Sequence, residues 1–316
     1  MIAKKNKLLF IALKLLLVLL IMGWLIKEGK LTTDSFGFIF SDPTSFISII
    51  FLIVFVSIPI VCLRWSIILK NMKSRKKSFF DIYKITLISH FFAIFMPGSA
   101  TADLSKGYYL HNDNKNKTNI YFSIILDRVA GLYSIVLMIF FFYAVNYEVI
   151  QKLEMLNLFC NALIVGFIFS NLIALIFKNK ILNSARNYKI KFLGYEISKI
   201  VDCILLLKIE VFTKALALSM LNQLVLIIIF MIIGISINNI GLADITNIAL
   251  ITPLGEISTM IPLFPIGIGI GHISFEGLYQ LFDYKNGANI FNIFVSAKII
   301  VGVIGGATYI TYSRKL

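Results

Sequence analysis

IPLFPIGIGIGHISFEG, residues 261–277, interrupts a strongly apolar part of this chain and decides how the rest of it is interpreted. Its two prolines remove backbone donors, and its three alternate glycines weaken any helix around them. Unpaired backbone groups are costly in hydrocarbon, so broken backbone survives there only inside protein or beside a water-filled cavity. His272 and Glu276 would share one face of a helix that begins at Gly271. The stretch predicts a discontinuous membrane helix built around a polar site.

A second stretch, residues 96–110, repeats this pattern earlier in the chain. It runs from an apolar approach to a Pro-Gly turn, through small residues to an acidic residue, and ends in a glycine followed by tyrosine. We interpret both stretches as helical hairpins whose tips contain proline and glycine: Pro97, Gly98, Pro265, Gly267, Gly269 and Gly271. The glycines of the second tip would let the backbones of the two hairpins approach closely.

Composition places the chain in a membrane. It is 59% hydrophobic, with a mean hydropathy of +0.89, and several apolar runs approach or exceed the length that crosses a bilayer. The net charge of +14 could suggest a nucleic-acid partner. The basic residues, however, cluster in short loops beside apolar runs, which is typical of membrane orientation. We therefore expect a polytopic helical membrane protein with no nucleic-acid partner.

The basic clusters also set the expected topology, because they mark the cytoplasmic side. We expect six full spans, at residues 8–26, 46–69, 120–145, 155–177, 212–237 and 288–310. Residues 79–110 form a hairpin that enters from the inner side, and residues 248–282 form one that enters from the outer side. An amphipathic helix at residues 191–208 lies in the cytoplasmic interface. Both termini are then cytoplasmic.

The two halves of the chain have matching plans of opposite orientation. Residues 46–145 are predicted to form a span, a hairpin that enters from the inner side, and a second span. Residues 212–310 are predicted to form a span, a hairpin that enters from the outer side, and a second span. The predicted fold is an all-α polytopic membrane protein with six full transmembrane helices plus two re-entrant helical hairpins arranged as an inverted repeat. Residues 1–316 form a single integral membrane domain. Two tilted full crossings in place of each hairpin would preserve the same sidedness, so that alternative stays open.

Four short motifs carry a resemblance to a known family. They are Arg64-Trp65, Pro97-Gly98 with Asp103 downstream, DRVAG at residues 127–131, and PIGIG at residues 265–269 with Glu276 downstream. In this order, over nearly the whole chain, they resemble the flippase-like family, which comprises the transmembrane region of lysylphosphatidylglycerol synthases and the UPF0104 proteins. The chain departs from the family pattern in the small residues 99–102 and in His272, where a basic residue is expected.

The resemblance implies lipid translocation, or support of lipid-linked transfer reactions, in a bacterial cytoplasmic membrane. In the synthases a soluble domain after the membrane part carries the aminoacyl transfer, whereas this chain ends directly after its last predicted span. We therefore expect that the chain is not itself an enzyme. Its expected partners are membrane lipids, either an anionic phospholipid or a polyprenyl-phosphate lipid, and a separate glycosyltransferase or aminoacyltransferase.

Charged side chains are rare at membrane depth, because each costs at least about 2.5–3.5 kcal/mol at a helix centre. Those in the spans and hairpins, together with one histidine, are the candidate substrate-binding residues: Arg64, Asp103, Asp127, Arg128, Glu256, His272, Glu276 and Lys298. We expect the two hairpin tips to meet near the midplane. There the N-termini of short helices and the cations would face an anionic headgroup.

Structural alternatives remain open for the first group of these residues. Asp127 and Arg128 point about 100° apart on a helix, so they do not simply neutralise each other. One of them is expected to pair across helices and brace the bundle. Arg64 lies near the inner end of its span, where it either snorkels to the headgroups or binds a phosphate with its forked donors.

The remaining candidates also have alternatives. Lys298 sits well inside the final span and needs a carboxylate, for which Glu256 and Glu276 are the natural partners. Asp103 follows the first tip and either caps the short helix or contacts the substrate. His272 and Glu276 supply too few ligands for a metal site. The alternate glycines lack the strand of a nucleotide-binding loop, so we expect no metal and no cofactor.

Three functions compete at this stage. The first is a flippase-like protein that translocates or binds an anionic lipid through a central polar site between the hairpins. The second is a non-transporting membrane subunit that presents lipid to a separate transferase. The third is a membrane-embedded transferase with Asp103, Glu256 or Glu276 as the general base, which would require an acceptor within hydrogen-bond reach.

Overall fold

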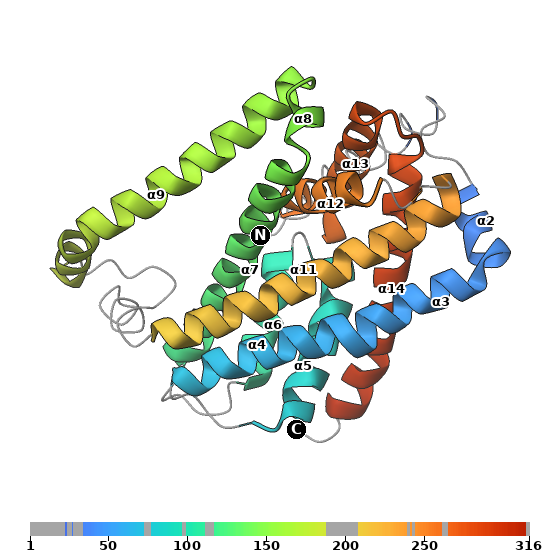
Figure 1. The fold of residues 1–316 in the computed structure, drawn as a ribbon. Helices are drawn as coiled ribbons and strands as arrows, with labels where there is room; N and C mark the ends of the chain where they lie inside the picture. The colour runs from blue at the N-terminus through green and yellow to red at the C-terminus, as the bar shows by residue number, and fades with distance from the viewer. Residues whose placement is uncertain are drawn as a thin grey trace, which may run out of the picture. The chain divides into compact units, whose positions relative to one another are not determined.

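The computed structural model describes residues 23, 27, 34–72, 77–96, 99–110, 117–187, 208–238, 241, 244–260 and 265–313. Within these residues the chain is helical and contains no strand (Figure 1). The predicted first span at residues 8–26 and the predicted interfacial helix at residues 191–208 lie outside the described residues, except for single positions. So do two predicted tip residues, Pro97 and Gly98.

Five helices are long and apolar enough to cross a membrane. The candidate spans are Pro43–Asn71, Lys117–Val145, Glu154–Ile173, Ile209–Asn238 and Gly287–Thr311. The helices that contain the last four are α7 (Lys117–Val145), α9 (Glu154–Asn187), α11 (Ile209–Asn238) and α14 (Gly287–Ser313). Each of the five overlaps a span predicted from the sequence, so the all-helical, multi-spanning fold class is confirmed for the described residues.

Shorter helices occupy the two stretches interpreted as hairpins. The first contains α5 (Phe79–Phe95) and α6 (Ser99–Leu110). The second contains α12 (Ile245–Thr259), the short 3-10 turn η3 (Pro265–Gly267) and α13 (Ile270–Leu281). Two further helices, α2 (Asp34–Ser41) and α8 (Tyr147–Ile150), lie where the sequence indicated loops. They were missed because neither has the length or the periodic apolar pattern that marks a span.

The first candidate span contains an irregular turn. It consists of α3 (Pro43–Phe51), the π-helical turn η1 (Leu52–Ser57) and α4 (Ile58–Asn71), which follow one another without a break. Pro59 lies within the span predicted at residues 46–69, and the ring of a proline clashes with the carbonyl four residues earlier in a regular helix. The wider π turn directly before the proline accommodates that clash, so the helix continues instead of breaking.

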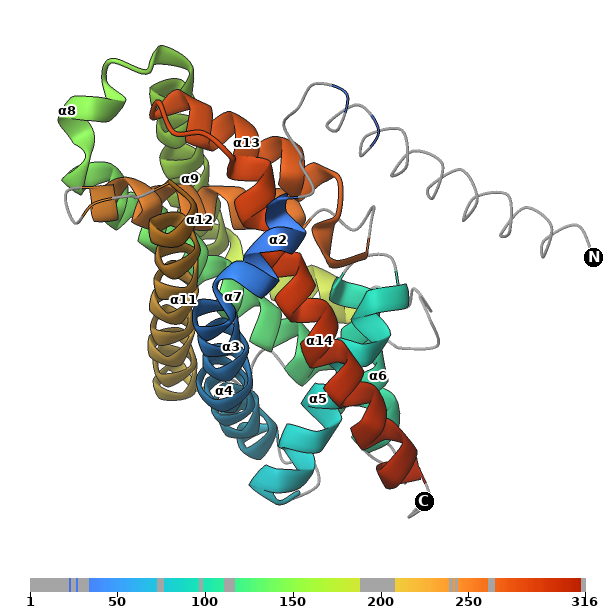
Figure 2. The ribbon, with the colours of Figure 1, turned by 90° about the vertical axis from the view of Figure 1, so that its right-hand side faces the viewer.

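The described residues form two compact units, each of which takes segments from both predicted repeats. The first unit comprises Met1–Val56, Thr86–Asp103 and Val225–Leu316, and the second comprises Ser57–Ile85 and Leu104–Leu224. In the first unit α14 packs against α2, α3 and α13, and α13 packs against α12 (Figure 2). The single-domain assignment and the inverted repeat stay predictions.

Glycines make the closest contact of the first unit. Gly302, Gly305 and Gly306 of α14 lie against the second half of α5, where a β-carbon at Gly305 would overlap the carbonyl oxygen of Leu87. The rings of Phe91 and Tyr309 stack beside this contact, with their centroids 6.0 Å apart. Small residues allow helix backbones to approach in this way inside membranes, where apolar burial supplies little net attraction.

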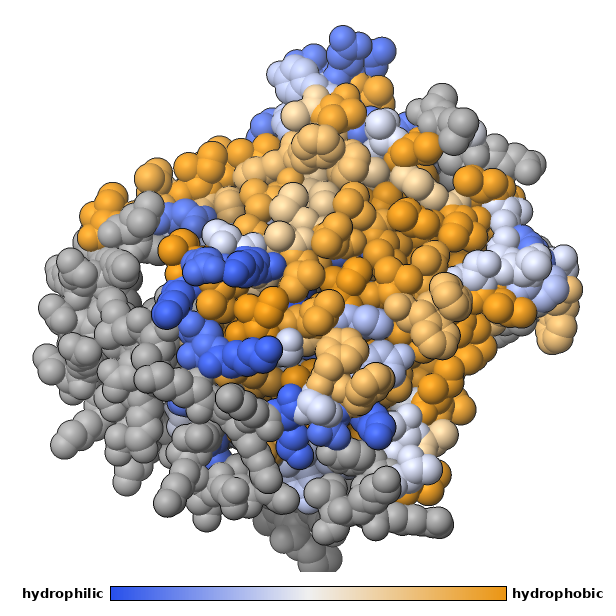
Figure 3. Space-filling view, turned by 60° about the horizontal axis from the view of Figure 1, so that its bottom comes forward, coloured by the Kyte–Doolittle hydropathy of each residue, from blue (hydrophilic) through white to orange (hydrophobic). Residues whose placement is uncertain are grey.

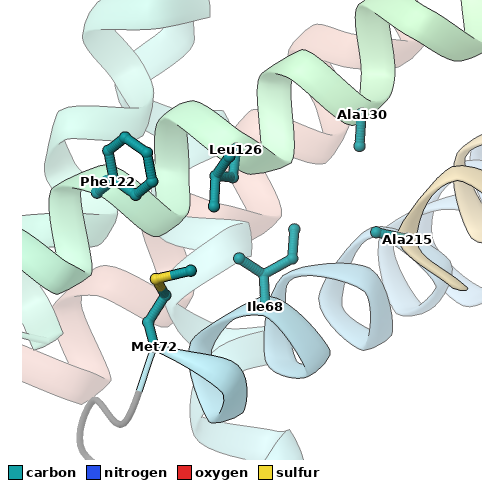
Figure 4. Packing of buried hydrophobic residues seen from close by; sticks show 6 residues of the cluster. All are labelled: Ile68, Met72, Phe122, Leu126, Ala130 and Ala215. Carbon is teal, nitrogen blue, oxygen red and sulfur yellow. The ribbon is translucent and has the colours of Figure 1, made fainter. Parts of the chain in front are cut away.

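In the second unit α4 packs against α7, and α7 packs against α9 and α8. Six buried apolar residues from α4, its C-terminal cap, α7 and α11 form a shared core (Figure 4): Ile68, Met72, Phe122, Leu126, Ala130 and Ala215. Large apolar side chains are also exposed along α9, including Met155, Leu158 and Phe169. Apolar residues likewise cover much of the face drawn in Figure 3, as expected for a lipid-facing surface.

Candidate functional site

A buried ion pair joins two helices of the second unit. Arg64 of α4 donates from Nε to Asp127 Oδ1 of α7 over 2.6 Å, and from Nη2 to Oδ2 over 2.8 Å. Its Nη1 donates to the hydroxyl of Ser219 on α11 over 2.8 Å. The side chains of the pair are 10% and 6% exposed. We call these three residues the arginine cluster, because one guanidinium connects three helices.

The ion pair across helices confirms one expectation drawn from the adjacent Asp127 and Arg128. Asp127 pairs with Arg64, whose position 63 residues earlier gave no hint of the partnership. The bidentate geometry is the strong form of this contact. The bonds to Asp127 and Ser219 also use most of the Arg64 donors that the sequence predicted for binding a phosphate. Arg128 is half-buried on the same helix.

The local sequence explains why Arg64 is held in place. Trp65, the next residue, is buried and donates from its indole nitrogen to the hydroxyl of Ser123 on α7 over 3.1 Å. The shared apolar core of α4, α7 and α11 contains Ala130 and Ala215, whose small side chains let the helices approach. Gly131 also lies beside the guanidinium, where a β-carbon would be in ordinary contact with Arg64 Nη1 at 3.6 Å.

Sequence reasoning missed three polar groups of the second unit. Lys106 on α6 is 6% exposed, and its Nζ lies 5.5 Å from the centre of the Trp65 ring. Ser219 and Gln223 on α11 are also buried. The available signal was their spacing of four residues, which places both on one face of an otherwise apolar helix.

In the first unit, His272 and Glu276 do share one face of α13, as predicted, and that face meets α14. The buried His272 ring accepts at Nδ1 from the Gly269 N–H over 3.3 Å, and its Nε2 lies 3.4 Å from Asn292 Oδ1. Glu276 Oε2 accepts from the Ala288 N–H over 2.9 Å, at the start of α14. A carboxylate at a helix N-terminus satisfies an orphan donor and complements the helix dipole.

The tip before α13 has strained backbone. Ile266 has a φ of 52°, and Gly267 and Gly269 have φ values of 76° and 88°. Only glycine adopts such angles without steric cost, whereas a β-branched residue there is an outlier. A β-carbon at Gly267 would lie 2.7 Å from the Thr259 β-carbon on α12, and one at Gly271 would overlap the Phe291 ring on α14. These glycines therefore fit the tip between α12 and α14.

Two of the tip glycines pack closely inside their own unit. The nearest described neighbours of Gly267 and Gly271 are Thr259 of α12 and Phe291 of α14. The sequence also predicts that the tip glycines let the two hairpins approach each other closely. The opposite tip at Pro97 and Gly98 lies outside the described residues. The meeting of the two tips therefore stays a prediction.

The last candidates are Glu256, Lys298 and Asp103. Lys298 on α14 is half-buried, its Nζ lies 4.3 Å from the centre of the Phe294 ring, and Glu256 on α12 interacts with it electrostatically. Of its two expected partners, Glu256 is therefore the one that acts on it. Asp103 is the fifth residue of α6 and lies beyond its first turn. The alternative that Asp103 caps this helix is wrong for that reason.

The structure thus gathers the candidates into two sets. Arg64, Asp127 and Arg128 lie in the second unit, whereas Glu256, His272, Glu276 and Lys298 lie in the first unit with Asp103. Among the described residues, no three His, Cys, Asp or Glu side chains come together as potential metal ligands.

Comparison with known proteins identifies the family. The model of the lysylphosphatidylglycerol synthase TM region matches residues 11–304, nearly the whole chain. The chain belongs to this family. The resemblance inferred from its short motifs is therefore confirmed, and the family match and the apolar helices together make the chain a multi-pass membrane protein. No curated protein and no solved structure matches it.

Proposed function

We propose that this chain binds an anionic lipid headgroup inside the membrane and moves it between the two faces of the bilayer. The observation that carries the proposal is an excess of positive charge within the second unit. Arg64, Lys106 and Arg128 are buried or half-buried there, against one buried carboxylate, Asp127, and one half-buried carboxylate, Asp81, among the described residues. Asp81 and the remaining described acidic residues of this unit lie at helix ends: Glu148, Glu154 and Glu210.

The excess of buried positive charge favours the binding of an anion. A cation at membrane depth costs at least about 2.5–3.5 kcal/mol, so such residues line polar paths or pair with anions. The buried and half-buried cations of this unit outnumber its buried carboxylate, and such an environment favours a phosphate. In the proposal the Arg64–Asp127 pair fixes α4 against α7, while Arg128 and Lys106 attract the headgroup.

The first unit has a supporting role in the proposal. His272 and Glu276 hold α13 against α14, and Glu256 interacts with Lys298 inside the same unit. Acyl or prenyl chains stay in the surrounding lipid while the headgroup crosses. The lipid is an anionic phospholipid or a polyprenyl-phosphate-linked sugar, and the chain acts in a cytoplasmic membrane with both termini inside.

The lengths of the short helices support the re-entrant form of the hairpins. At about 1.5 Å per residue, α5 is about 26 Å long, α12 about 22 Å, and α6 and α13 about 18 Å each, against a hydrocarbon core of about 30 Å. A Met260→Cys variant tests this, because Met260 ends the first arm of the second hairpin. A re-entrant hairpin keeps this thiol from an impermeant reagent on the cytoplasmic side. Full labelling from that side would support two tilted crossings instead.

Reconstitution tests the transport. Liposomes containing the protein and acyl-labelled fluorescent phosphatidylglycerol should expose inner-leaflet lipid to an external quencher faster than protein-free liposomes. Arg128→Ala and Lys106→Ala should each slow this exposure roughly tenfold, the effect of losing one charged contact. The matched control is Lys214→Ala, because Lys214 is 59% exposed and pairs only at the surface with Glu210. Exposure no faster than in protein-free liposomes would refute transport.

A second candidate follows from the family description, which names the membrane region of a synthase. The chain would then present lipid to a separate glycosyltransferase or aminoacyltransferase without moving it, and would not itself be an enzyme. Tight binding of anionic lipid without transport in the same liposomes, together with co-purification of such a transferase, would favour this candidate. Turnover by the isolated chain would favour a membrane-embedded transferase.

A further inference from the structure

One buried amide of the second unit has a side-chain oxygen with no partner. Gln223 on α11 is 4% exposed, and within the described residues its Oε1 accepts no hydrogen bond. A buried acceptor without a donor loses the hydrogen bond that it makes to water in the unfolded chain, so it costs stability. Leucine or methionine at this position would avoid the cost. Packing alone therefore does not explain why a glutamine occupies position 223.

The neighbours of Gln223 place it beside the arginine cluster. Ser219 lies one helical turn earlier on the same face of α11 and accepts from Arg64 Nη1 over 2.8 Å. Asn222, the preceding residue, accepts from the Ser57 hydroxyl over 2.7 Å. Ser219 is thus bonded to α4, and Asn222 is bonded to Ser57, the last residue of η1. Gln223 adds an acceptor without a partner to the same stretch of α11.

We propose that Gln223 is a specificity-determining residue that accepts a hydrogen bond from a hydroxyl or ammonium group of the bound headgroup. The inference rests on the proposed function, since it requires the anionic lipid to bind beside Arg128 and Lys106. It adds a chemical requirement that the cations cannot impose. The preferred lipid carries a donor next to its phosphate, so charge alone is not sufficient for tight binding.

The burial of the acceptor fits alternating exposure. In the state described here Oε1 is enclosed by protein, so a donor reaches it only when the helices around it separate. A ligand shifts a conformational equilibrium by its difference in affinity for the two states. A headgroup with a donor gains this hydrogen bond only in the open state, and therefore favours opening. A headgroup without one leaves the acceptor unsatisfied in both states.

Two lipids of equal charge test the requirement. Dioleoyl phosphatidylglycerol and dioleoyl phosphatidylmethanol are both phosphodiesters with one negative charge, and only the first has headgroup hydroxyls. Binding to the full chain in phosphatidylcholine nanodiscs, measured by native mass spectrometry, should favour phosphatidylglycerol about tenfold, the effect of one buried hydrogen bond. Gln223→Met removes the acceptor at similar side-chain length. It should abolish the preference and leave binding of phosphatidylmethanol unchanged.

The control is Tyr279→Phe in the first unit. Among the described residues, the Tyr279 hydroxyl is the other neutral buried group that has no hydrogen-bond partner. Tyr279→Phe therefore also removes an unsatisfied polar atom, but in the other unit. This variant should keep the tenfold preference. Gln223→Leu repeats the measurement with a different side-chain shape, should the methionine variant not fold.

The outcomes separate the two proposals. A preference that survives in both folded Gln223 variants would overturn the role of Gln223 while leaving anionic-lipid binding intact. Equal binding of both anionic lipids to the unchanged protein, each above phosphatidylcholine, would overturn it too. Binding of neither lipid above phosphatidylcholine would instead refute the proposed function, and with it the site on which the inference depends.

Discussion

In the second unit Arg64 and Asp127 bond to each other across helices, whereas in the first unit Glu276 and His272 bond to backbone groups at helix ends. The Arg64 guanidinium joins Asp127 and Ser219 on two other helices. Glu276 instead accepts from the first turn of α14, and His272 accepts from the backbone N–H of Gly269. Residues of one chemical type thus serve as interhelical links in one unit and as caps in the other. A charge at membrane depth therefore does not by itself identify a ligand site.

Among the variants that test this difference between the units, Asp127→Ala should lower the stability of the protein the most. It leaves the Arg64 guanidinium buried without its carboxylate, which should lower the free energy of unfolding by about 3–5 kcal/mol. Unfolding in detergent, followed by circular dichroism against temperature, measures the loss. The double variant Arg64→Leu/Asp127→Leu should recover most of it, because no uncompensated charge remains. Equal instability of the single and double variants would show that the pair contributes more than charge compensation.

Glu276→Gln should have a smaller effect. The amide oxygen can still accept from the Ala288 N–H, but the charge-assisted bond becomes a neutral one, a loss of about 1 kcal/mol. Glu276→Leu removes the acceptor altogether and should cost about 2–3 kcal/mol, since that donor is then unsatisfied. The same unfolding measurement compares the two. If Glu276 lies near the bound anionic headgroup, Glu276→Gln will also strengthen binding of anionic lipid in nanodiscs, because the variant removes a like-charge repulsion.

The smallest effect should come from Asp42, an exposed cap of α3. Hydrogen bonds from Ser45, Thr44 and Ser236 lower the pKa of Asp42 to about 2. Because the folded pKa lies below the unfolded value, this carboxylate stabilises the fold above about pH 4 and loses that contribution as the pH falls to about 2. Asp42→Asn keeps an acceptor for the Ser45 N–H without titrating. Its melting temperature should fall less over that range than that of the unchanged protein.

Hydropathy predicted the helices well because apolar length alone decides whether a segment can cross a bilayer. The sequence assigned α5 and α11 to within a few residues, and it placed the breaks around Pro265 correctly. The span predicted at residues 46–69 is not a regular helix throughout, because a π turn precedes Pro59. That difference depends on hydrogen-bond register within one turn, which composition does not reveal.

The candidate site was harder to predict than the fold. Asp127 and Arg128 stand out as adjacent charges, yet the partner of Asp127 comes from a distant helix and depends on how α4 packs on α7. Gln223 lies in a helix of high average hydropathy, and a single amide side chain lowers that average only slightly. Lys106 precedes two further lysines, Lys115 and Lys117, so the sequence alone does not show that its side chain is buried. Pairwise packing, which a single sequence does not show, decides all three.

The glycine face of α14 limits how mutations there can be compensated. A β-carbon at Gly306 would meet the Phe91 ring, and one at Gly302 would overlap the Ile94 δ-carbon and lie 3.1 Å from the His90 carbonyl oxygen. A smaller residue on α5 could therefore relieve the Gly306 contact, and the Gly302 contact once the His90 carbonyl shifts by a few tenths of an ångström. A side chain at Gly305 would meet the carbonyl oxygen of Leu87, which every residue at position 87 possesses. Second-site suppressors in that contact should therefore arise for Gly302 and Gly306 variants. For Gly305 no exchange at position 87 removes the obstacle, and only reversion or displacement of a whole helix would do so.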